Sequence, residues 1–381
     1  MKKRSGIATA LALVAVVACV AALAGGRAAP ATAAGVPCDG LPIGFMAPIT
    51  GFVAFIGGEQ LHWAQYSLDK FNKENGTSFT LSQFDTQDLN PALAQLGATK
   101  LSSDKNVFGV VGPAGSQEVR ASGPVFKKAG MAFLSPSATN ADLTGGKYPT
   151  FFRVVGSDNQ QATGDALFMI KKLKAKKVFI VDDQEAYSTG IADKAGNVLR
   201  SAGVKVQRES VSQKATDFSS LVSKISSDTS VVFLPWQVAA SAQLFYQQMV
   251  EQGKKMPIFG SDGLDSGDFK APGRYISTFA RDIHGLPGTA AVIKEYEDRY
   301  GTKWGSFGPP AYVSVQALLT AMKTSCKDKK SSRAEVIGNL RKVKLPTTIL
   351  GLPVQFDGKG QNKYAKFYIY KVTGDKKALV G

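Results

Sequence analysis

Short apolar runs recur along the chain, and most of them end in a polar or glycine-containing turn. Between them lie longer stretches in which apolar residues repeat with helical spacing, as Leu61, Ala64, Leu68 and Phe71 do within residues 59–75. This alternation predicts buried parallel strands connected by helices, which is an α/β fold. The expected strands cover residues 41–48, 79–85, 107–111, 131–135, 151–155, 177–183, 204–210, 230–236 and 256–260.

The strand–helix pattern occurs twice, and residues 151–155 are expected to cross from the first set to the second. Helices over 289–300, 309–322 and 332–343 follow with few new strands, so we expect them to return to the first set. The fold class is therefore two doubly wound, Rossmann-like lobes joined by crossover hinge strands, with a ligand cleft between them. The predicted boundaries are 35–156 plus 286–352 for lobe 1, and 157–285 plus 353–381 for lobe 2. The last strands are expected to form a hairpin with a glycine-rich turn, from residues 352–361 and 365–372.

Residues 1–34 have the features of a secretory signal peptide. A basic start, MKKR, precedes the apolar run IATALALVAVVACVAALA and a stretch of small residues. The protein is therefore expected to be exported, to the periplasm or the cell surface. Two alternatives stay open: an uncleaved membrane anchor, and lipidation at Cys19 that tethers the mature chain.

Charge and cysteine content add two expectations. The net charge is +16, and removal of Lys2, Lys3, Arg4 and Arg27 with the signal leaves +12. The lysines are scattered and no nucleic-acid motif accompanies them, so we expect a solvated basic surface and no nucleic-acid partner. Cys38 and Cys326 remain after processing, and in an exported protein they either pair or stay as free thiols.

Two loops after neighbouring strands are the strongest candidates for a binding site. The turn PAGS follows the strand 107–111, and the loop SPSATN follows the strand 131–135. Both are expected at the carboxyl edge of the sheet, where open α/β sheets hold ligands. Ser116 is placed at a helix start, which suits an anion. Together with Ser137, Ala138 and Thr139 it is expected to bind the carboxylate of a small solute.

The second lobe offers the complementary chemistry. Tyr187 follows the strand 177–183, and Asp262 follows the strand 256–260. An acid and a phenol at this edge would bind the ammonium group of an amino acid. Phe52, Phe55 and Ile56, in an expected first loop, and Trp236 after the strand 230–236 are candidates for an apolar side-chain pocket.

No catalytic machinery is visible in the sequence. There is no phosphate-binding loop and no nucleophile elbow, and the two histidines have no partner at metal-ligand spacing. We therefore expect a binding protein rather than an enzyme, with no metal and no cofactor.

Residues 40–372 resemble the leucine/isoleucine/valine-binding protein family. This family comprises type I periplasmic-type solute-binding proteins of branched-chain amino-acid ABC transporters. The resemblance lies in VVGPAGSQEVRASGPVFKKAGMAFLSPSATNADLT, in DDQEAYSTG, in ATDFSSLVSKI and in IFGSDGL.

The resemblance implies a role for each candidate residue. Ser116, Ser137, Ala138 and Thr139 would hold the carboxyl and amino groups, and Tyr187 would be the cleft tyrosine. Asp262 takes the place of an ammonium-binding acid that is usually Glu in branched-chain amino-acid binders.

The resemblance also implies a monomer that closes around a small amino acid and delivers it to a membrane ABC permease. Two alternatives remain. One is a receptor for an amide or for an aromatic or aliphatic carboxylate that lacks the amine. The other is a sensor subunit for a membrane signalling partner.

Overall fold

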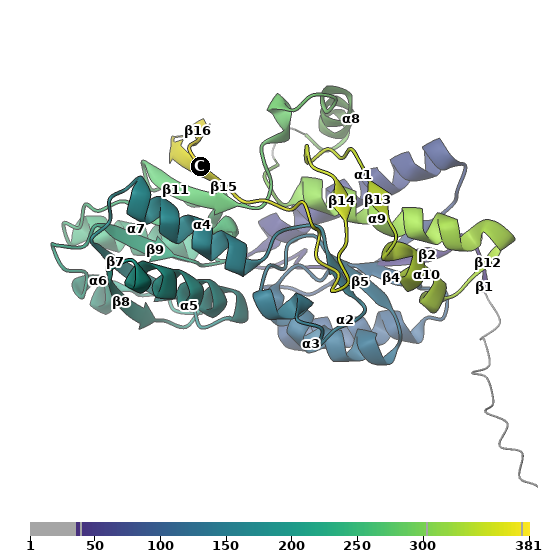
Figure 1. Ribbon diagram of the computed structural model, residues 1–381, viewed down its shortest axis with the longest axis horizontal. Coiled ribbons are helices and arrows are strands. Elements are labelled where there is room, and N and C mark those ends of the chain that lie inside the picture. Colours follow the sequence, from purple (N-terminus) through teal and green to yellow (C-terminus); the bar gives the residue numbers. More distant parts are fainter. Residues whose placement is uncertain (1–35, 39, 302–303, 375) are drawn as a thin grey trace, which may run out of the picture. The chain divides into compact units, whose positions relative to one another are not determined.

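The computed structural model describes residues 36–38, 40–301, 304–374 and 376–381. The expected signal segment and Cys19 lie outside the described residues. A parallel five-stranded sheet and a mixed seven-stranded sheet, each covered by helices on both faces, form the framework of the described chain (Figure 1). The expected α/β class is therefore confirmed.

The first sheet has five parallel strands in the order β3-β2-β4-β5-β6. Side chains alternate between its two faces, so that Phe45 and Val111 contribute to one apolar core and Met46 and Val110 to the other. Burial on both faces explains why the inner strands β2, β4 and β5 are largely apolar, whereas the edge strand β3 also carries polar residues. The strands are β2 (Pro42–Ala47), β3 (Thr80–Asp85), β4 (Gly109–Val111), β5 (Ala132–Ser135) and β6 (Phe151–Arg153).

The second sheet has seven strands in the order β16-β15-β11-β10-β9-β7-β8. Five are parallel, while β15 runs antiparallel to both β11 and β16. Phe179 and Val181 face one core of this sheet, and Val178 and Ile180 face the other. The strands are β7 (Lys177–Asp182), β8 (Lys205–Ser210), β9 (Val231–Leu234), β10 (Ile258–Gly260), β11 (Arg274–Thr278), β15 (Tyr368–Thr373) and β16 (Lys376–Leu379).

Helices pack in pairs over the sheets. In the first sheet α1 contacts α9 and α2 contacts α3, and in the second α4 contacts α5 and α6 contacts α7. Because α9 also contacts β4 and β5, the late part of the chain returns to the first sheet (Figure 1). The helices are α1 (Ala54–Asn75), α2 (Pro91–Ser103), α3 (Ser116–Lys128), α4 (Asp158–Lys171), α5 (Ala186–Ser201), α6 (Ser219–Ser223), α7 (Ala239–Glu251), α8 (Ala290–Tyr300), α9 (Gly308–Ser325) and α10 (Arg333–Leu340).

Three local predictions were wrong. Helix α1 begins at Ala54, so Phe55 lies in its first turn and not in a loop. Strand β11 was not predicted, because its sequence RYIST has only two adjacent apolar residues, Tyr275 and Ile276, and so no continuous apolar run. The expected final hairpin is also absent as such: β14 (Val354–Gln355) pairs with β13 (Lys344–Leu345), and β15 pairs with β11 and β16 in the second sheet.

A disulfide joins Cys38 to Cys326, with their Cα atoms 5.9 Å apart. Pairing of β1 (Val36–Pro37) with β12 (Lys330–Ser331) brings these two segments together. The bond closes a span of 288 residues. It therefore ties the segment before β2 to the C-terminal end of α9, and the question of pairing left open by the sequence is settled in its favour.

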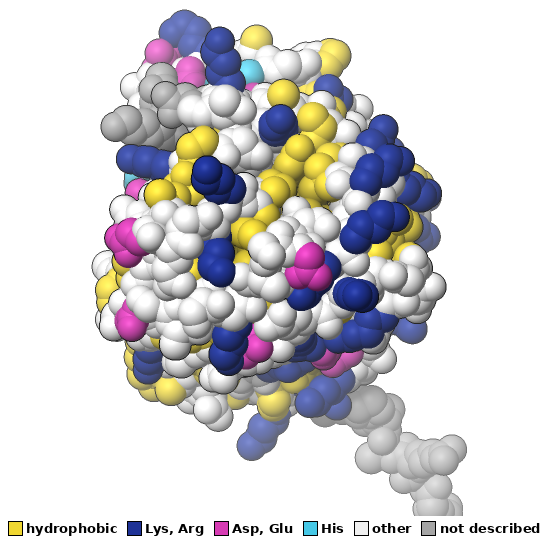
Figure 2. Space-filling model, turned by 90° about the vertical axis from the view of Figure 1, so that its left-hand side faces the viewer, with side chains coloured by type: hydrophobic (Ala, Val, Ile, Leu, Met, Phe, Trp, Pro, Cys, Tyr) yellow, Lys and Arg dark blue, Asp and Glu magenta, His cyan; other side chains and the backbone are white. Residues whose placement is uncertain are grey.

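The surface of the second-sheet side is strongly basic. Figure 2 shows Lys and Arg side chains over much of this face, with few Asp or Glu among them. Exposed lysines at 171, 172, 174 and 176 lie between α4 and β7. Among the described residues, no helix is both long and apolar enough to cross a membrane.

Candidate ligand-binding site

The first element of the site is the turn between β4 and α3. A Cβ atom at Gly112, where φ is +108°, would lie 2.0 Å from the Met46 carbonyl oxygen, so only glycine fits this close approach. The chain then enters α3 at Ser116, which is buried. Its Oγ accepts a hydrogen bond of 3.1 Å from the backbone N–H of Asn140. Since β4 and β5 are parallel neighbours, the prediction that their two loops meet at one edge is confirmed.

Hydrogen bonds fix the loop after β5. The Ser137 hydroxyl donates to the Ala114 carbonyl (2.8 Å) and accepts from Gln60 Nε2 (2.8 Å). The Ala138 N–H donates to Ser135 Oγ (2.9 Å). This part of the site is neutral, and most of its polar groups already have partners within the protein.

Thr139 differs from its neighbours in that loop. Its carbonyl accepts from the Asp158 N–H at 2.8 Å, which holds the backbone in place. Its hydroxyl is fully buried and has no hydrogen bond of ordinary geometry, although it lies close enough to Asp158 to lower the pKa of that carboxyl group. The Thr139 hydroxyl is therefore the buried side-chain group of this loop that lacks a regular partner within the described chain.

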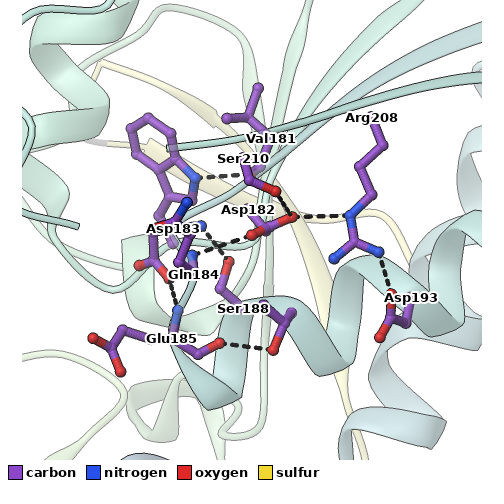
Figure 3. A network of polar contacts seen from close by, with 11 residues as sticks. Val181, Asp182, Asp183, Gln184, Glu185, Ser188, Asp193, Arg208 and Ser210 are labelled. Atoms are coloured by element: carbon purple, nitrogen blue, oxygen red, sulfur yellow. Dashed lines mark hydrogen bonds and ion pairs between the residues drawn. The ribbon is translucent and has the colours of Figure 1, made fainter. Parts of the chain in front are cut away.

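Figure 3 shows a polar network at the carboxyl end of β7, in the segment that leads to Tyr187. The Asp182 carboxylate accepts from Arg208 Nε (2.9 Å), which anchors the end of the strand. The Asp183 N–H donates to Ser188 Oγ (2.9 Å), so the loop is tied to the first turn of α5. Tyr187, between these anchors, is buried and directed toward Asp262.

Tyr187 and Asp262 form the second-sheet part of the site. Asp262 begins a short 3₁₀ turn, Asp262–Leu264, after β10. Tyr187 Oη lies 2.8 Å from Asp262 Oδ1 and 2.7 Å from Ser261 Oγ, while Gln161 Nε2 donates to Asp262 Oδ1 at 2.5 Å. Burial raises the pKa of Asp262 to about 7, against the lowering effect of the hydrogen bonds from Tyr187 and Gln161.

A small cavity lies between these parts. It brings together five of the predicted residues, Ile56, Ser116, Ser137, Tyr187 and Asp262. The remaining lining residues are Leu89, Ala114, Gln237, Gly263 and Phe307.

Five predicted residues are not in this lining, and one of them, Phe52, is 79% exposed. Ala138 and Thr139 lie behind it, in the same loop as Ser137. Phe55 packs edge-to-face on Phe307, with ring centroids 5.9 Å apart, and so supports a lining residue. Trp236 is placed in the core of the second sheet.

The position of Trp236 is set by three contacts. Its indole N–H donates to the Val181 carbonyl at 2.8 Å. Its ring packs on Phe218 and Phe245, with centroids 5.2 and 5.5 Å away. A large aromatic side chain after a buried strand thus fills the core here.

The sequence interpretation missed several lining residues. Gln237 is buried, and its Oε1 accepts from Gln117 Nε2 at 3.0 Å, which links the loop after β9 to the first turn of α3. A polar residue next to the end of a buried strand was the available signal for Gln237. Leu89 and Phe307 carried no signal, because an apolar residue in a loop is equally compatible with core packing.

The sequence profile of a family described as periplasmic binding protein matches residues 40–377. The chain belongs to this family. Among curated relatives, the leucine-, isoleucine-, valine-, threonine- and alanine-binding protein of Pseudomonas aeruginosa is 25% identical over 342 residues, covering 87% of this chain and 90% of the relative.

Solved structures of periplasmic binding proteins share the fold. The branched-chain amino-acid transporter substrate-binding protein LivJ of Streptococcus pneumoniae, in complex with isoleucine, superposes with a TM-score of 0.78 at 25% identity, covering 89% of this chain and 99% of that one. A solute-binding protein of an ABC transporter from R. palustris, in complex with benzoate, gives 0.80 at 18% identity, with 90% and 95% covered. The expected type I fold with two lobes is confirmed.

Membership of the periplasmic binding protein family confirms two further expectations. The chain is a solute-binding protein and not an enzyme, and it is of the class that is exported and works with ABC transporters.

Proposed function

We propose that this periplasmic binding protein captures a small apolar amino acid in the cavity and delivers it to an ABC permease by closure of its lobes. The main support for this proposal is the composition of the cavity lining. Hydroxyl groups from the first sheet face a phenol and a carboxylate from the second. Such a pair of surfaces is complementary to a zwitterion. The relatives named for branched-chain amino acids support the same class of solute.

Each part of the cavity has a role in this proposal. Ser116, Ser137, Ala138 and Thr139 bind the carboxylate and one face of the ammonium group. Tyr187 and Asp262 bind the ammonium group from the other side.

The apolar side chains of Ile56, Leu89 and Phe307 surround the solute's side chain. Phe55 supports this apolar wall through Phe307, whereas Trp236 stabilises the second sheet.

A receptor for a carboxylate without the amine is the second candidate. The benzoate complex of the R. palustris protein motivates it, since that protein shares this fold. A sensor subunit that presents the closed form to a membrane signalling partner is a third.

The processing and assembly of the chain complete the proposal. Residues 1–34 are removed as a signal peptide, or the chain is lipidated at Cys19. Residues 35–156 with 286–352 move as one lobe against 157–285 with 353–381. The mature protein acts as a monomer and binds no nucleic acid.

Calorimetric titration of the mature protein with leucine, isoleucine, valine, threonine, alanine, phenylalanine and benzoate tests the proposal. We expect tight binding of one or more of the aliphatic amino acids and weaker binding of benzoate. Tyr187→Phe should weaken the best amino acid, because it removes the hydroxyl that contacts Asp262. Tyr246→Phe, in α7 and outside the cavity lining, is the matched control. Failure of every amino acid to bind would contradict the proposed function.

A further inference from the structure

The edge of the second sheet that lies opposite the ligand-binding loops is basic. Strands β7, β8, β9 and β10 are parallel, so their amino ends share this edge, while Tyr187 and Asp262 follow the opposite ends of β7 and β10. Exposed cations occur in the segments that lead into these strands. We call them the basic edge: Lys171, Lys172, Lys174, Lys176, Arg200, Lys205 and Lys255.

Backbone hydrogen bonds bring these segments side by side. The Lys205 N–H donates to the Lys176 carbonyl at 3.0 Å, where β8 begins to pair with β7. The Val232 N–H donates to the carbonyl of Pro257, two residues after Lys255, at 3.0 Å. Because β9 also pairs with β7, all of these segments meet at one end of the sheet. Cations that are spread over residues 171–255 in the sequence therefore gather on one surface, and Figure 2 shows Lys and Arg side chains over much of this side.

Few acids accompany these cations. None of the side chains of the basic edge takes part in an ion pair within the described part of the chain. Asp228, in the segment before β9, is paired with Lys177 at 2.9 Å and so neutralises a lysine outside the set. Glu251, the last residue of α7, is exposed and is the acid nearest to Lys255 in the sequence. The basic edge therefore keeps a positive charge, at a cost in repulsion between like charges.

Helix dipoles account for part of the basic edge. Cations are favoured in the last turn of a helix, and Lys171 and Arg200 occupy this position in α4 and α5. Lys174 and Lys176 lie beyond the end of α4, and Lys205 begins a strand. The effect of the dipole falls off beyond the last turn, so helix stability does not explain why these further cations gather here.

A partner bound at the basic edge leaves the cavity open. The cavity lining contains none of the residues of the basic edge. The six residues of β7 separate the two ends of the sheet by about 20 Å at the usual rise of a strand. Solute binding and docking through the basic edge can therefore occur together.

We propose that the basic edge binds the surface of an anionic lipid bilayer. All of its cations except Arg200 are lysines, whose hydrated ammonium groups act as point charges on flexible stems. Point charges suit a fluid array of lipid phosphates, whereas the planar fork of arginine suits one anion in a fixed geometry. A bilayer is also the surface that surrounds an ABC transporter, with which proteins of this class work. The inference goes beyond the proposed function, because it concerns where the exported protein is held.

The strength of this attraction depends on the number of cations and on salt. A lysine near an anionic membrane surface increases the affinity about fivefold. The field of the surface extends about 10 Å at 0.1 M salt and less at higher concentrations. Binding through the basic edge should therefore be lost when lysines are removed or when the salt concentration is raised.

Sedimentation of the mature protein with lipid vesicles tests the proposal. The protein is produced from Gly35 onward, so that no lipid is attached at Cys19. One kind of vesicle contains equal parts of phosphatidylglycerol and phosphatidylcholine, and the other contains phosphatidylcholine alone. We expect binding to the anionic vesicles at about 0.1 M salt, release at about 0.5 M salt, and no measurable binding to the neutral vesicles.

Two variants of equal net charge separate the basic edge from the charge of the whole protein. The first carries Lys171→Gln, Lys172→Gln, Lys174→Gln and Lys176→Gln. The matched control carries substitutions at exposed lysines of other segments, Lys105→Gln, Lys128→Gln, Lys342→Gln and Lys359→Gln. Both changes lower the net charge of the mature chain from +12 to +8. Affinity for the anionic vesicles should fall by about a hundredfold or more in the first variant, and the control should bind nearly as well as the natural protein.

Equal losses in the two variants would overturn the proposal, and so would equal binding to both kinds of vesicle or binding that does not respond to salt. Leucine should bind both variants and the natural protein alike, with or without vesicles. Failure of leucine to bind in all of these samples would therefore count against the proposed function and not against the basic edge. The salt response of the natural protein requires no variant, so the test holds even if a variant fails to fold.

Discussion

The two parts of the site differ in how their buried polar groups are hydrogen-bonded. In the neutral half, which comprises Ser116, Ser137, Ala138 and Thr139, hydroxyl and backbone groups bind one another, and the Thr139 hydroxyl alone lacks a regular partner. In the acidic half, which comprises Tyr187 and Asp262 with Gln161, Asp158 and Asp165, both carboxylate oxygens of Asp158 and one of Asp165 have no hydrogen-bond partner within the described chain.

This difference indicates what each half contributes to binding. We expect a neutral, hydrogen-bonded loop to keep its shape whether or not a solute is present. Its hydrogen-bonding groups then bind a carboxylate that fits their positions. A cluster of buried acids is stabilised by a cation, so it selects for charge. We therefore expect changes in the acidic half to alter which solutes bind, and changes in the neutral half to weaken all of them.

The largest expected effect is that of Asp262→Ala. Removal of this buried acid should cost an amino acid about 2–5 kcal/mol of binding free energy and spare 4-methylpentanoate, the deaminated analogue of leucine. Titration calorimetry with both ligands measures the difference between the two losses of binding free energy. Asp268→Ala, exposed in the segment after Asp262, is the control. An equal loss for both ligands would remove the distinction between the halves.

The disulfide should affect the folding of the protein and not its selectivity. Replacement of Cys38 and Cys326 together by serine should lower the free energy of unfolding by about 2–4 kcal/mol, since a long loop is no longer closed. Urea denaturation of both proteins measures this change. Solute preference should be unchanged, and a shift in the ratio of leucine to 4-methylpentanoate affinity would show that the bond also shapes the site.

Ser116→Ala tests the neutral half. Loss of its hydroxyl should weaken amino acids and simple carboxylates alike, by about 1–3 kcal/mol for a hydrogen bond to a charged group. Ser122→Ala is a matched control, because Ser122 is buried in the same helix and bonds only the Glu118 carbonyl. If the deaminated analogue is spared, the carboxylate is not bound by this half.

The acidic half should make the empty protein less stable as the pH rises. The pKa of Asp158 is raised to about 8 in the folded protein, so between its ordinary value and 8 the folded state binds more protons than the unfolded state. Stability is then lost with increasing pH, by at most about 1.4 kcal/mol per pH unit for one such group. Denaturation of the natural protein and Asp158→Asn at pH 5 and 8 should show a smaller decline in the variant, and parallel declines would contradict the assignment.

The smallest expected effect concerns the bond between the halves. Gln117→Ala removes the hydrogen bond to Gln237, and affinity for every solute should fall by about 0.5–1.5 kcal/mol. A double-mutant cycle with Gln237→Ala isolates the pair. Additive losses in the cycle would indicate that the bond does not contribute to the bound state.

The sequence by itself determined the local architecture and the ends of the strands. Strands buried on both faces are continuous apolar runs, and the apolar residues of a helix recur at the helical period. Both elements can therefore be recognised from neighbouring residues. That was sufficient to place Ser116, Ser137, Tyr187 and Asp262 shortly after the ends of strands. Strand β11 was missed for the same reason, since Arg274–Thr278 does not form a continuous apolar run.

Only the tertiary structure decided which distant groups meet. The pairing of Cys38 with Cys326 depends on packing across 288 residues. The assignment of Trp236 to a core, and the meeting of Asp158 with Thr139 and of Asp165 with Ser277, depend on how loops pack against neighbouring helices. Burial and missing hydrogen-bond partners arise from these meetings, because they are properties of a packed environment and not of a residue's place in the sequence.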